Sequence, residues 1–246
     1  MRNIKLTMEY DGSRYSGWQR LGKGESENTI ENKLLEVINK MTGEAVELNC
    51  GSRTEVGVHA YSQIANFKTK SDLKLYEVKN YLNRYLPMDI AVIQAEEAPE
   101  RFHATLNAKS KTYLYRIAIG DAPSVFDRKY TYYSFHKPDP DKMRDAAKLL
   151  VGKHDFKDFS TVKKSKSTVK EVYAIEVEEK EKEIHITMKA NDFLHNMARM
   201  LAATLMEIGL EQRSPKELTA ILDPEQDAAG SLPASAQGLF LKEIEY

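Results

Sequence analysis

The sequence predicts an α+β fold in which a mostly antiparallel sheet, arranged in two similar halves, is flanked by helices. Segments that alternate apolar and polar residues, as half-buried strands do, recur along the 246 residues. Segments with apolar residues at helical spacing lie between them. A short charged turn, "KEK", joins two alternating segments near residue 181, which is typical of an antiparallel hairpin. Together these patterns favour antiparallel strands covered by helices.

The first half is predicted to begin with a strand over residues 3–10, because Ile4, Leu6, Met8 and Tyr10 fall on one face. A loop rich in glycine and charge follows to residue 28. Asn28 is expected to cap a helix with Glu31 three positions later, and Gly43 to end that helix. The remaining elements expected here are strands over 45–50, 61–69 and 89–98 and a helix over 74–85, before Pro87.

The second half shows a similar order of elements. Its expected strands cover 111–120, 171–179, 183–190 and 238–246, and its expected helices end at Leu150, span 193–208 and start at Ser214. Asp139 or Asp141 is expected to cap the first of these helices, and Phe193 to be buried by the second. We expect residues 1–105 to form the N-terminal half and residues 106–246 the C-terminal half.

Composition limits the environment more than the function. The net charge is −1, from 36 basic and 37 acidic residues, so it neither requires nor excludes a nucleic-acid partner. The single cysteine, Cys50, indicates a reducing compartment, and we predict a cytoplasmic protein. No apolar run approaches the roughly 18 residues that a membrane helix needs, so no membrane association is expected.

The segment "GSRTEVGVHA" places Arg53 two residues before Glu55. In an extended segment the two side chains point the same way. At ~4 Å and an effective dielectric of ~20, such a pair gains roughly 4 kcal/mol of Coulomb energy before desolvation, which keeps the glutamate ionised. One interpretation is an ion pair on a turn. The other is a carboxylate ready for nucleophilic attack or proton abstraction.

Metal and nucleotide cofactors are not expected. The six histidines form no HExxH pattern, no second cysteine is available as a ligand, and no glycine-rich phosphate motif is present. The sequence therefore predicts a site made of side chains alone.

Aromatic and basic residues suggest contact with RNA, although each also has a structural interpretation. Tyr113 and Tyr115 share a strand face, where they either fill the core or offer a ring for base stacking. A loop mixes cations with aromatic residues, as binders of looped RNA do, or is simply solvated; its residues are Arg14, Tyr15, Trp18, Arg20 and Lys23. A second cluster is a soluble surface or a phosphate contact; it comprises Lys163, Lys164, Lys166 and Lys170.

Six segments, in chain order, resemble the motifs of the tRNA pseudouridine synthase A family. They are "YDGSRYSGWQR", "GSRTEVGVHAYSQIANF", "LNRYLPMDIAV", "RFHATLNAKSKTYLYRI", "ANDFLHNMARMLAATLMEIG" and "LPASAQGLFL". They cover nearly the whole chain. The resemblance implies the pseudouridine synthase fold with a cleft between its halves, a homodimer, and isomerisation of uridine to pseudouridine in the anticodon stem-loop of tRNA without a cofactor or metal.

The resemblance also implies roles for individual residues. Glu55 falls on the position of the family's catalytic aspartate, and Arg53 on that of its partner arginine. Substrate-binding positions fall on Tyr113, whose ring stacks on the uracil, on Arg199, and on Leu239 in the block that closes the pocket. Arg14, Arg20 and Lys23 fall in a loop that reaches the tRNA.

Three residues depart from the family pattern: Glu55 for aspartate, Thr105 for an arginine and Ala203 for a glycine. The added methylene moves the carboxylate by roughly 1.5 Å. A misplacement of ~1 Å costs about 100-fold in rate, or ~2.7 kcal/mol, which predicts a slow enzyme rather than an inactive one. The alternative is a weakly active or inactive paralogue that binds tRNA and assists its folding.

Overall fold

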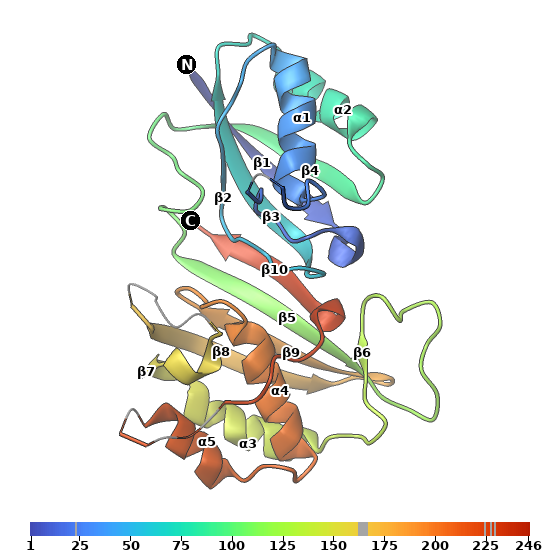
Figure 1. Ribbon diagram of the computed structural model, residues 1–246, viewed down its shortest axis with the longest axis vertical. Helices are drawn as coiled ribbons and strands as arrows, with labels where there is room; N and C mark the ends of the chain where they lie inside the picture. Colours follow the sequence, from blue (N-terminus) through green and yellow to red (C-terminus); the bar gives the residue numbers. More distant parts are fainter. Residues whose placement is uncertain (23, 162–166, 224, 227, 229) are drawn as a thin grey trace. The chain divides into compact units, whose positions relative to one another are not determined.

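The computed structural model describes residues 1–22, 24–161, 167–223, 225–226, 228 and 230–246. The chain divides into two compact units, which are described separately. Unit 1 comprises Met1–Lys109 with Phe240–Tyr246, and unit 2 comprises Ser110–Leu239. Both contain mainly antiparallel strand pairs with helices packed on them, so the predicted α+β class is confirmed (Figure 1).

Unit 1 is built on strands in the order β4-β1-β3-β10, with β2 also paired to β3. All these pairs are antiparallel except β3 with β10, in which Phe240 lies opposite His59. The strands are β1 (Arg2–Tyr10), β2 (Leu48–Cys50), β3 (His59–Thr69), β4 (Ile90–Ala98) and β10 (Leu239–Glu245). The predicted apolar face of the first strand is confirmed, because Ile4, Leu6, Met8 and Tyr10 are all buried.

Two helices pack on the strands of unit 1, α1 (Ile30–Thr42) and α2 (Leu75–Tyr85) (Figure 1). The first ends as predicted at Gly43, whose φ of 71° suits a glycine. The predicted cap at Asn28 is wrong: Thr29 caps the helix, accepting the Asn32 N–H on its side chain. Asn28 and Thr29 are both good caps, so composition alone could not separate adjacent positions.

Unit 2 has antiparallel strands in the order β5-β9-β8-β7, with β6 paired in parallel to β5. They are β5 (Ser110–Ala118), β6 (Tyr132–Tyr133), β7 (Gly152–Asp155), β8 (Val169–Glu179) and β9 (Glu183–Ala190). The helices are α3 (Pro140–Leu150), α4 (Met197–Gly209) and α5 (Pro215–Leu222). Asp139 and Ser214 cap α3 and α5, as the sequence predicts.

Helix α4 is the core helix of unit 2, with 11 of its 13 residues buried. It starts at Met197 rather than at residue 193, so the predicted burial of Phe193 in this helix is wrong. Asn196 precedes the helix with a φ of 63°, a left-handed conformation that stops the helix from extending backwards. None of the described helices is long and apolar enough to cross a membrane.

Candidate active site

The segment that carries Arg53 and Glu55 is a loop between β2 and β3 of unit 1. Its first residues are bonded to β3: the Gly51 N–H donates to the Ile64 carbonyl over 2.7 Å. The Gln63 side chain is fully buried and bonds both backbone groups of Ser52, accepting its N–H over 3.2 Å and donating to its carbonyl over 2.6 Å. One amide therefore replaces a missing strand partner and fixes the entry to the loop.

The Tyr10 hydroxyl, at the end of β1, joins this network. It accepts a hydrogen bond from the Gln63 Nε2 over 3.2 Å and lies 2.7 Å from the Thr54 Oγ1. Burial raises the pKa of Tyr10 far above its usual value, so the phenol stays protonated and can donate to Thr54. Thr54, immediately before Glu55, is thereby tied to the core of the unit.

The N-terminal loop approaches the Glu55 segment at two glycines. The Trp18 N–H donates to the Thr54 carbonyl over 2.9 Å. Gly17 has a φ of 84°, and a Cβ there would come within 3.0 Å of the Thr54 carbonyl oxygen and 3.2 Å of the Glu55 carbonyl carbon. At Gly12 a Cβ would meet the Val58 oxygen at 2.0 Å. The two glycines let one backbone pack directly on the other.

The far end of the loop is closed by a turn and a buried histidine. The Val58 N–H donates to the Glu55 carbonyl over 3.1 Å, across Gly57 with its φ of 77°. The fully buried His59 accepts the Gly12 N–H on its Nδ1 over 3.1 Å, and its ring stacks on Phe240 with 4.7 Å between centroids. The loop is therefore anchored at its entry, at Thr54 and at its exit.

Arg53 and Glu55 differ in exposure: the arginine is exposed, and the glutamate is half-buried. Both residues lie outside the strands, in the segment between the end of β2 at Cys50 and the start of β3 at His59. An exposed guanidinium can form charge-assisted hydrogen bonds with an anionic oxygen.

Tyr113 and Leu239 lie in unit 2. Tyr113, on β5, is 6% exposed, and its ring meets Phe193 edge-on with 5.0 Å between centroids. Leu239 is the first residue of β10 and is buried. Phe193, which sequence reasoning assigned to a helix, instead fixes the plane of the tyrosine ring.

Arg199 lies in the first turn of α4, and backbone and side-chain acceptors of unit 2 hold its guanidinium. The Nε donates to the Ala234 carbonyl over 2.6 Å, and the Nη1 donates to the Asn196 Oδ1 over 3.0 Å. Asn196, which precedes α4 in a left-handed conformation, is thus also a hydrogen-bond acceptor for this arginine. These two bonds fix the orientation of the guanidinium.

Ionic contacts constrain one of the predicted RNA-binding residues. The Arg14 guanidinium donates to the Asp89 Oδ2 from its Nε and Nη2, over 3.0 and 2.6 Å, while its side chain stays 70% exposed. The Tyr15 hydroxyl donates to the other oxygen of Asp89 over 2.5 Å. Arg20 is exposed. Four predicted contacts fall outside the described residues, namely Lys23, Lys163, Lys164 and Lys166.

Comparison with known proteins identifies the family. The family model for tRNA pseudouridine synthase matches residues 6–107 and 146–246. The chain belongs to the tRNA pseudouridine synthase family. A "tRNA pseudouridine synthase A 2" of Bacillus anthracis is 44% identical over 247 residues, covering the whole of both chains. A "tRNA pseudouridine synthase A 1" of Clostridium tetani is 43% identical over 248 residues, also covering both completely.

As a member of the tRNA pseudouridine synthase family, the protein is an isomerase. The resemblance inferred from the six sequence segments is confirmed. A further relative, a "tRNA pseudouridine synthase A" of a Bacillus species, is 42% identical over 247 residues and again matches end to end.

Sequence reasoning missed the structural roles of several residues around the candidate site. The Thr105 Oγ1 donates to the Cys50 carbonyl over 2.6 Å, so the residue that departs from the family pattern secures the strand leading into the Glu55 loop. Gln63 was also missed. No sequence pattern singles it out, because β3 also buries the polar side chains of His59, Asn66 and Thr69.

A carboxylate near Tyr113 was also missed. Asp192 accepts hydrogen bonds from Lys111 over 2.6 Å and from Lys170 over 3.1 Å. Burial raises the pKa of Asp192, but the two lysines outweigh it and leave the pKa below its usual value. Lys111 lies two residues before Tyr113, and Asp192 directly precedes Phe193, so this cluster secures both sides of the ring pair.

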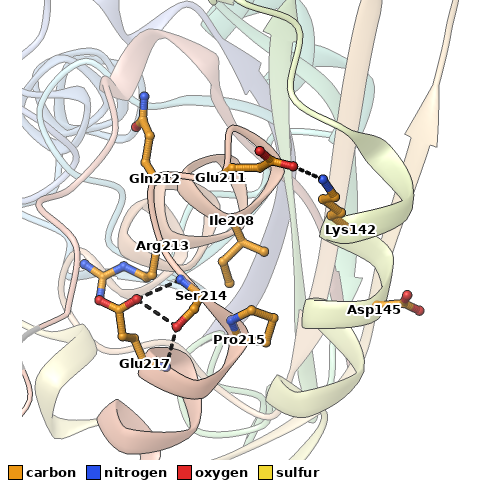
Figure 2. A pocket seen from close by; sticks show the side chains of 9 residues that line it. All are labelled: Lys142, Asp145, Ile208, Glu211, Gln212, Arg213, Ser214, Pro215 and Glu217. Atoms are coloured by element: carbon orange, nitrogen blue, oxygen red, sulfur yellow. Dashed lines mark hydrogen bonds and ion pairs between the residues drawn. The ribbon is translucent and has the colours of Figure 1, made fainter.

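A pocket of ≈ 540 Å³ lies away from these residues, between α3 and the turn from α4 to α5 (Figure 2). Its charged side chains are held by local contacts: Lys142 pairs with Glu211, and Glu217 accepts hydrogen bonds from Ser214 over 2.8 Å. None of the predicted site residues lines it. Within the described part of the chain, no group of three or more His, Cys, Asp or Glu side chains is arranged to hold a metal ion.

Proposed function

We propose that this protein isomerises uridine to pseudouridine in the anticodon stem-loop of tRNA, with Glu55 as the catalytic carboxylate. The observation that carries the proposal is the anchoring of the Glu55 loop. Its entry is bonded to Gln63, its centre to Tyr10 and Trp18, and its exit closes over Gly57. A carboxylate on so fixed a backbone is preorganised for chemistry. Family membership supplies the reaction.

The reaction requires one bond to break and another to form at the same sugar carbon. The bond from ribose C1′ to uracil N1 breaks, the base turns, and C1′ joins C5. The C5 proton is then lost to solvent, and N1 gains a proton. Glu55 acts either by attack on C1′ or by removing a ribose proton. Both roles require the ionised carboxylate.

The other site residues bind the substrate in this proposal. The Tyr113 ring stacks on the extruded uracil, the Arg53 and Arg199 guanidinium groups bind anionic or polar oxygens of the nucleotide, and Leu239 lines the pocket. Removing the base from its stack costs a few kcal/mol and is least costly in loops, which favours an anticodon-arm target.

Basic residues outside the pocket hold the tRNA backbone in this proposal, namely Arg14, Arg20, Lys23, Lys163, Lys164 and Lys166. We further propose that the protein works as a homodimer in the cytoplasm. Such phosphate contacts predict that tRNA affinity falls steeply as salt rises.

The experiment is to incubate unmodified tRNA transcripts with the protein and to map pseudouridine along the RNA. We expect modification in the anticodon stem-loop by the wild type and none by Glu55→Gln, with tRNA affinity retained. Modification outside the anticodon arm would refute the target. Tight tRNA binding with no pseudouridine anywhere would instead establish the RNA-binding paralogue without catalysis.

A further inference from the structure

Helix α2 differs from the other four helices in the side chains it exposes. Within the five described helices, every aromatic residue lies on α2: Tyr76, Tyr81 and Tyr85. Tyr76 is 59% exposed and Tyr85 is 54% exposed. Met88, just beyond the helix, is fully exposed. Tyr85 and Met88 are exposed together at the C-terminal end of the helix, and neighbouring exposed apolar side chains of this size mark an interaction surface.

Counted with its N-cap, helix α2 is also the one helix among these five that carries a net charge. With its N-cap, α2 has three cations, Lys74, Lys79 and Arg84, against one carboxylate, Glu77, which gives +2. Each of the other four helices is balanced when its N-cap is included. The Glu77 carboxylate is already hydrogen-bonded within the helix, because its Oε2 accepts a hydrogen bond from the Lys74 backbone N–H over 2.7 Å. The exposed surface of α2 is therefore suited to a polyanion.

The cations lie against the rings. The Arg84 guanidinium lies 5.7 Å from the centroid of Tyr85, and the Lys74 Nζ lies 5.9 Å from that of Tyr76. Tyr81 and Tyr85 contact each other with 4.5 Å between centroids. We call these residues, at the C-terminal end of the helix, the α2 face: Tyr81, Arg84, Tyr85 and Met88. It combines flat rings with positive charge, which single-stranded RNA binders use for bases and phosphates.

The α2 face adjoins the loop already assigned to RNA. Asp89 directly follows Met88. Its side chain accepts a hydrogen bond from the Arg14 guanidinium, and its backbone carbonyl accepts one from the Asp11 N–H. The same loop continues to Gly17, whose α-carbon packs against the Glu55 backbone. An RNA that reaches Glu55 along this loop therefore has the α2 face next to its path, in the same unit.

We propose that the α2 face binds the tRNA substrate outside the target nucleotide, with an unpaired base stacked on Tyr85 and a phosphate paired with Arg84. This inference rests on the proposed function, because that function supplies the RNA. The positive charge and its continuity with the Arg14 loop favour RNA over a second copy of this chain, whose net charge of −1 offers little complementarity.

The test measures the affinity of full-length, unmodified tRNA transcript for Tyr85→Ala, Tyr85→Phe and Arg84→Ala over a series of salt concentrations. Tyr85→Ala is expected to bind tRNA roughly 5- to 150-fold more weakly, because it loses the stacking free energy of one base. Tyr85→Phe keeps the ring and is expected to bind as the wild type does. Arg84→Ala is expected to weaken binding. It is also expected to reduce the slope of log affinity against log salt concentration by about 0.7 to 0.9, which corresponds to the loss of one phosphate contact.

Two exposed residues of unit 2 serve as matched controls: Tyr173→Ala on β8 and Lys148→Ala on α3, both expected to bind tRNA as the wild type does. Wild-type affinity and salt slope in Tyr85→Ala and Arg84→Ala would overturn the proposal. So would sedimentation showing that Tyr85→Ala dissociates a dimer while each protomer keeps its tRNA affinity, because the face would then hold a second copy.

Failure of this inference is distinguishable from failure of the proposed function. If the wild type forms pseudouridine and Tyr85→Ala binds tRNA normally, only the inference fails. If the wild type forms none, yet Tyr85→Ala loses tRNA affinity and Tyr85→Phe keeps it, the function fails and the α2 face remains an RNA-binding surface. Saturating tRNA should restore the wild-type rate to Tyr85→Ala, because Tyr85 does not touch the reacting atoms.

Discussion

Gly17→Ala tests whether the position of the Glu55 backbone controls the rate. Gly17 has a φ of 84°, and a Cβ at this position would lie 3.0 Å from the Thr54 oxygen, 3.2 Å from the Glu55 carbonyl carbon and 3.3 Å from the Val56 nitrogen. All three atoms belong to the backbone of the Glu55 loop. They cannot swing aside as the end of a flexible side chain can, so the loop must shift.

The size of the effect follows from these distances. Ordinary contact begins near 3.4 Å, so the backbone must retreat by a few tenths of an ångström. If a displacement of ~1 Å costs about 100-fold in rate, one of ~0.4 Å costs roughly 6-fold. The left-handed conformation adds about 1–2 kcal/mol of destabilisation for any residue other than glycine.

The assay is pseudouridine formation under single-turnover conditions, with protein in excess over tRNA, alongside thermal unfolding. Gly43→Ala is the matched control: its φ is 71°, and no atom lies within 4 Å of the added Cβ. Both variants should lose similar stability, but only Gly17→Ala should react more slowly. Equal rates in the two variants would refute the link between the loop position and the chemistry.

Three further predictions concern the same two units. Glu55→Asp should raise the single-turnover rate, because it removes the added methylene; a lower rate would show that the loop is built for glutamate. Tyr10→Phe should lower the free energy of unfolding by about 1–3 kcal/mol, because two buried partners lose their hydrogen bonds, and chemical denaturation measures this. The pKa of Asp192 is lower in the folded protein than in the unfolded chain. Its contribution to stability is therefore present above about pH 4 and is lost as the pH falls through the pKa of the folded state. The unfolding free energy should therefore depend less on acid pH in Asp192→Asn, and an unchanged dependence would contradict this.

The strands and most helix ends could be predicted from the sequence because their signals are local. Ile4, Leu6 and Met8 alternate, and Gly43 and Ser214 mark a helix end and start. The start of α4 was misjudged because Phe193 and Met197 stand at helical spacing. Nothing in the pattern of side chains shows that Asn196 adopts a left-handed conformation between them. The short strands β6 and β7 have too few residues to display a period.

The residues of the candidate site were predicted from motifs, but the residues that hold the Glu55 backbone in place were not. The sequence identifies Glu55 as a carboxylate in an unusual segment, yet the atoms that hold its backbone come from distant positions. Tyr10 and Gly17 precede it by 45 and 38 residues, and Gln63 follows from the next strand. Such contacts depend on strand register and tertiary packing, which hydrophobic periodicity does not encode. The expected alignment of Arg53 with Glu55 assumed an extended backbone, and it stays a prediction, since the two residues lie between β2 and β3 rather than in a strand.

The most direct test of the central claim is tritium release from tRNA labelled at uracil C5, measured in single turnover for the wild type and for Glu55→Gln. The amide has nearly the same shape as the acid but carries no charge. We predict rapid release by the wild type and none by Glu55→Gln, with equal tRNA affinity. Release at the wild-type rate by Glu55→Gln would show that the carboxylate of residue 55 takes no part in the reaction.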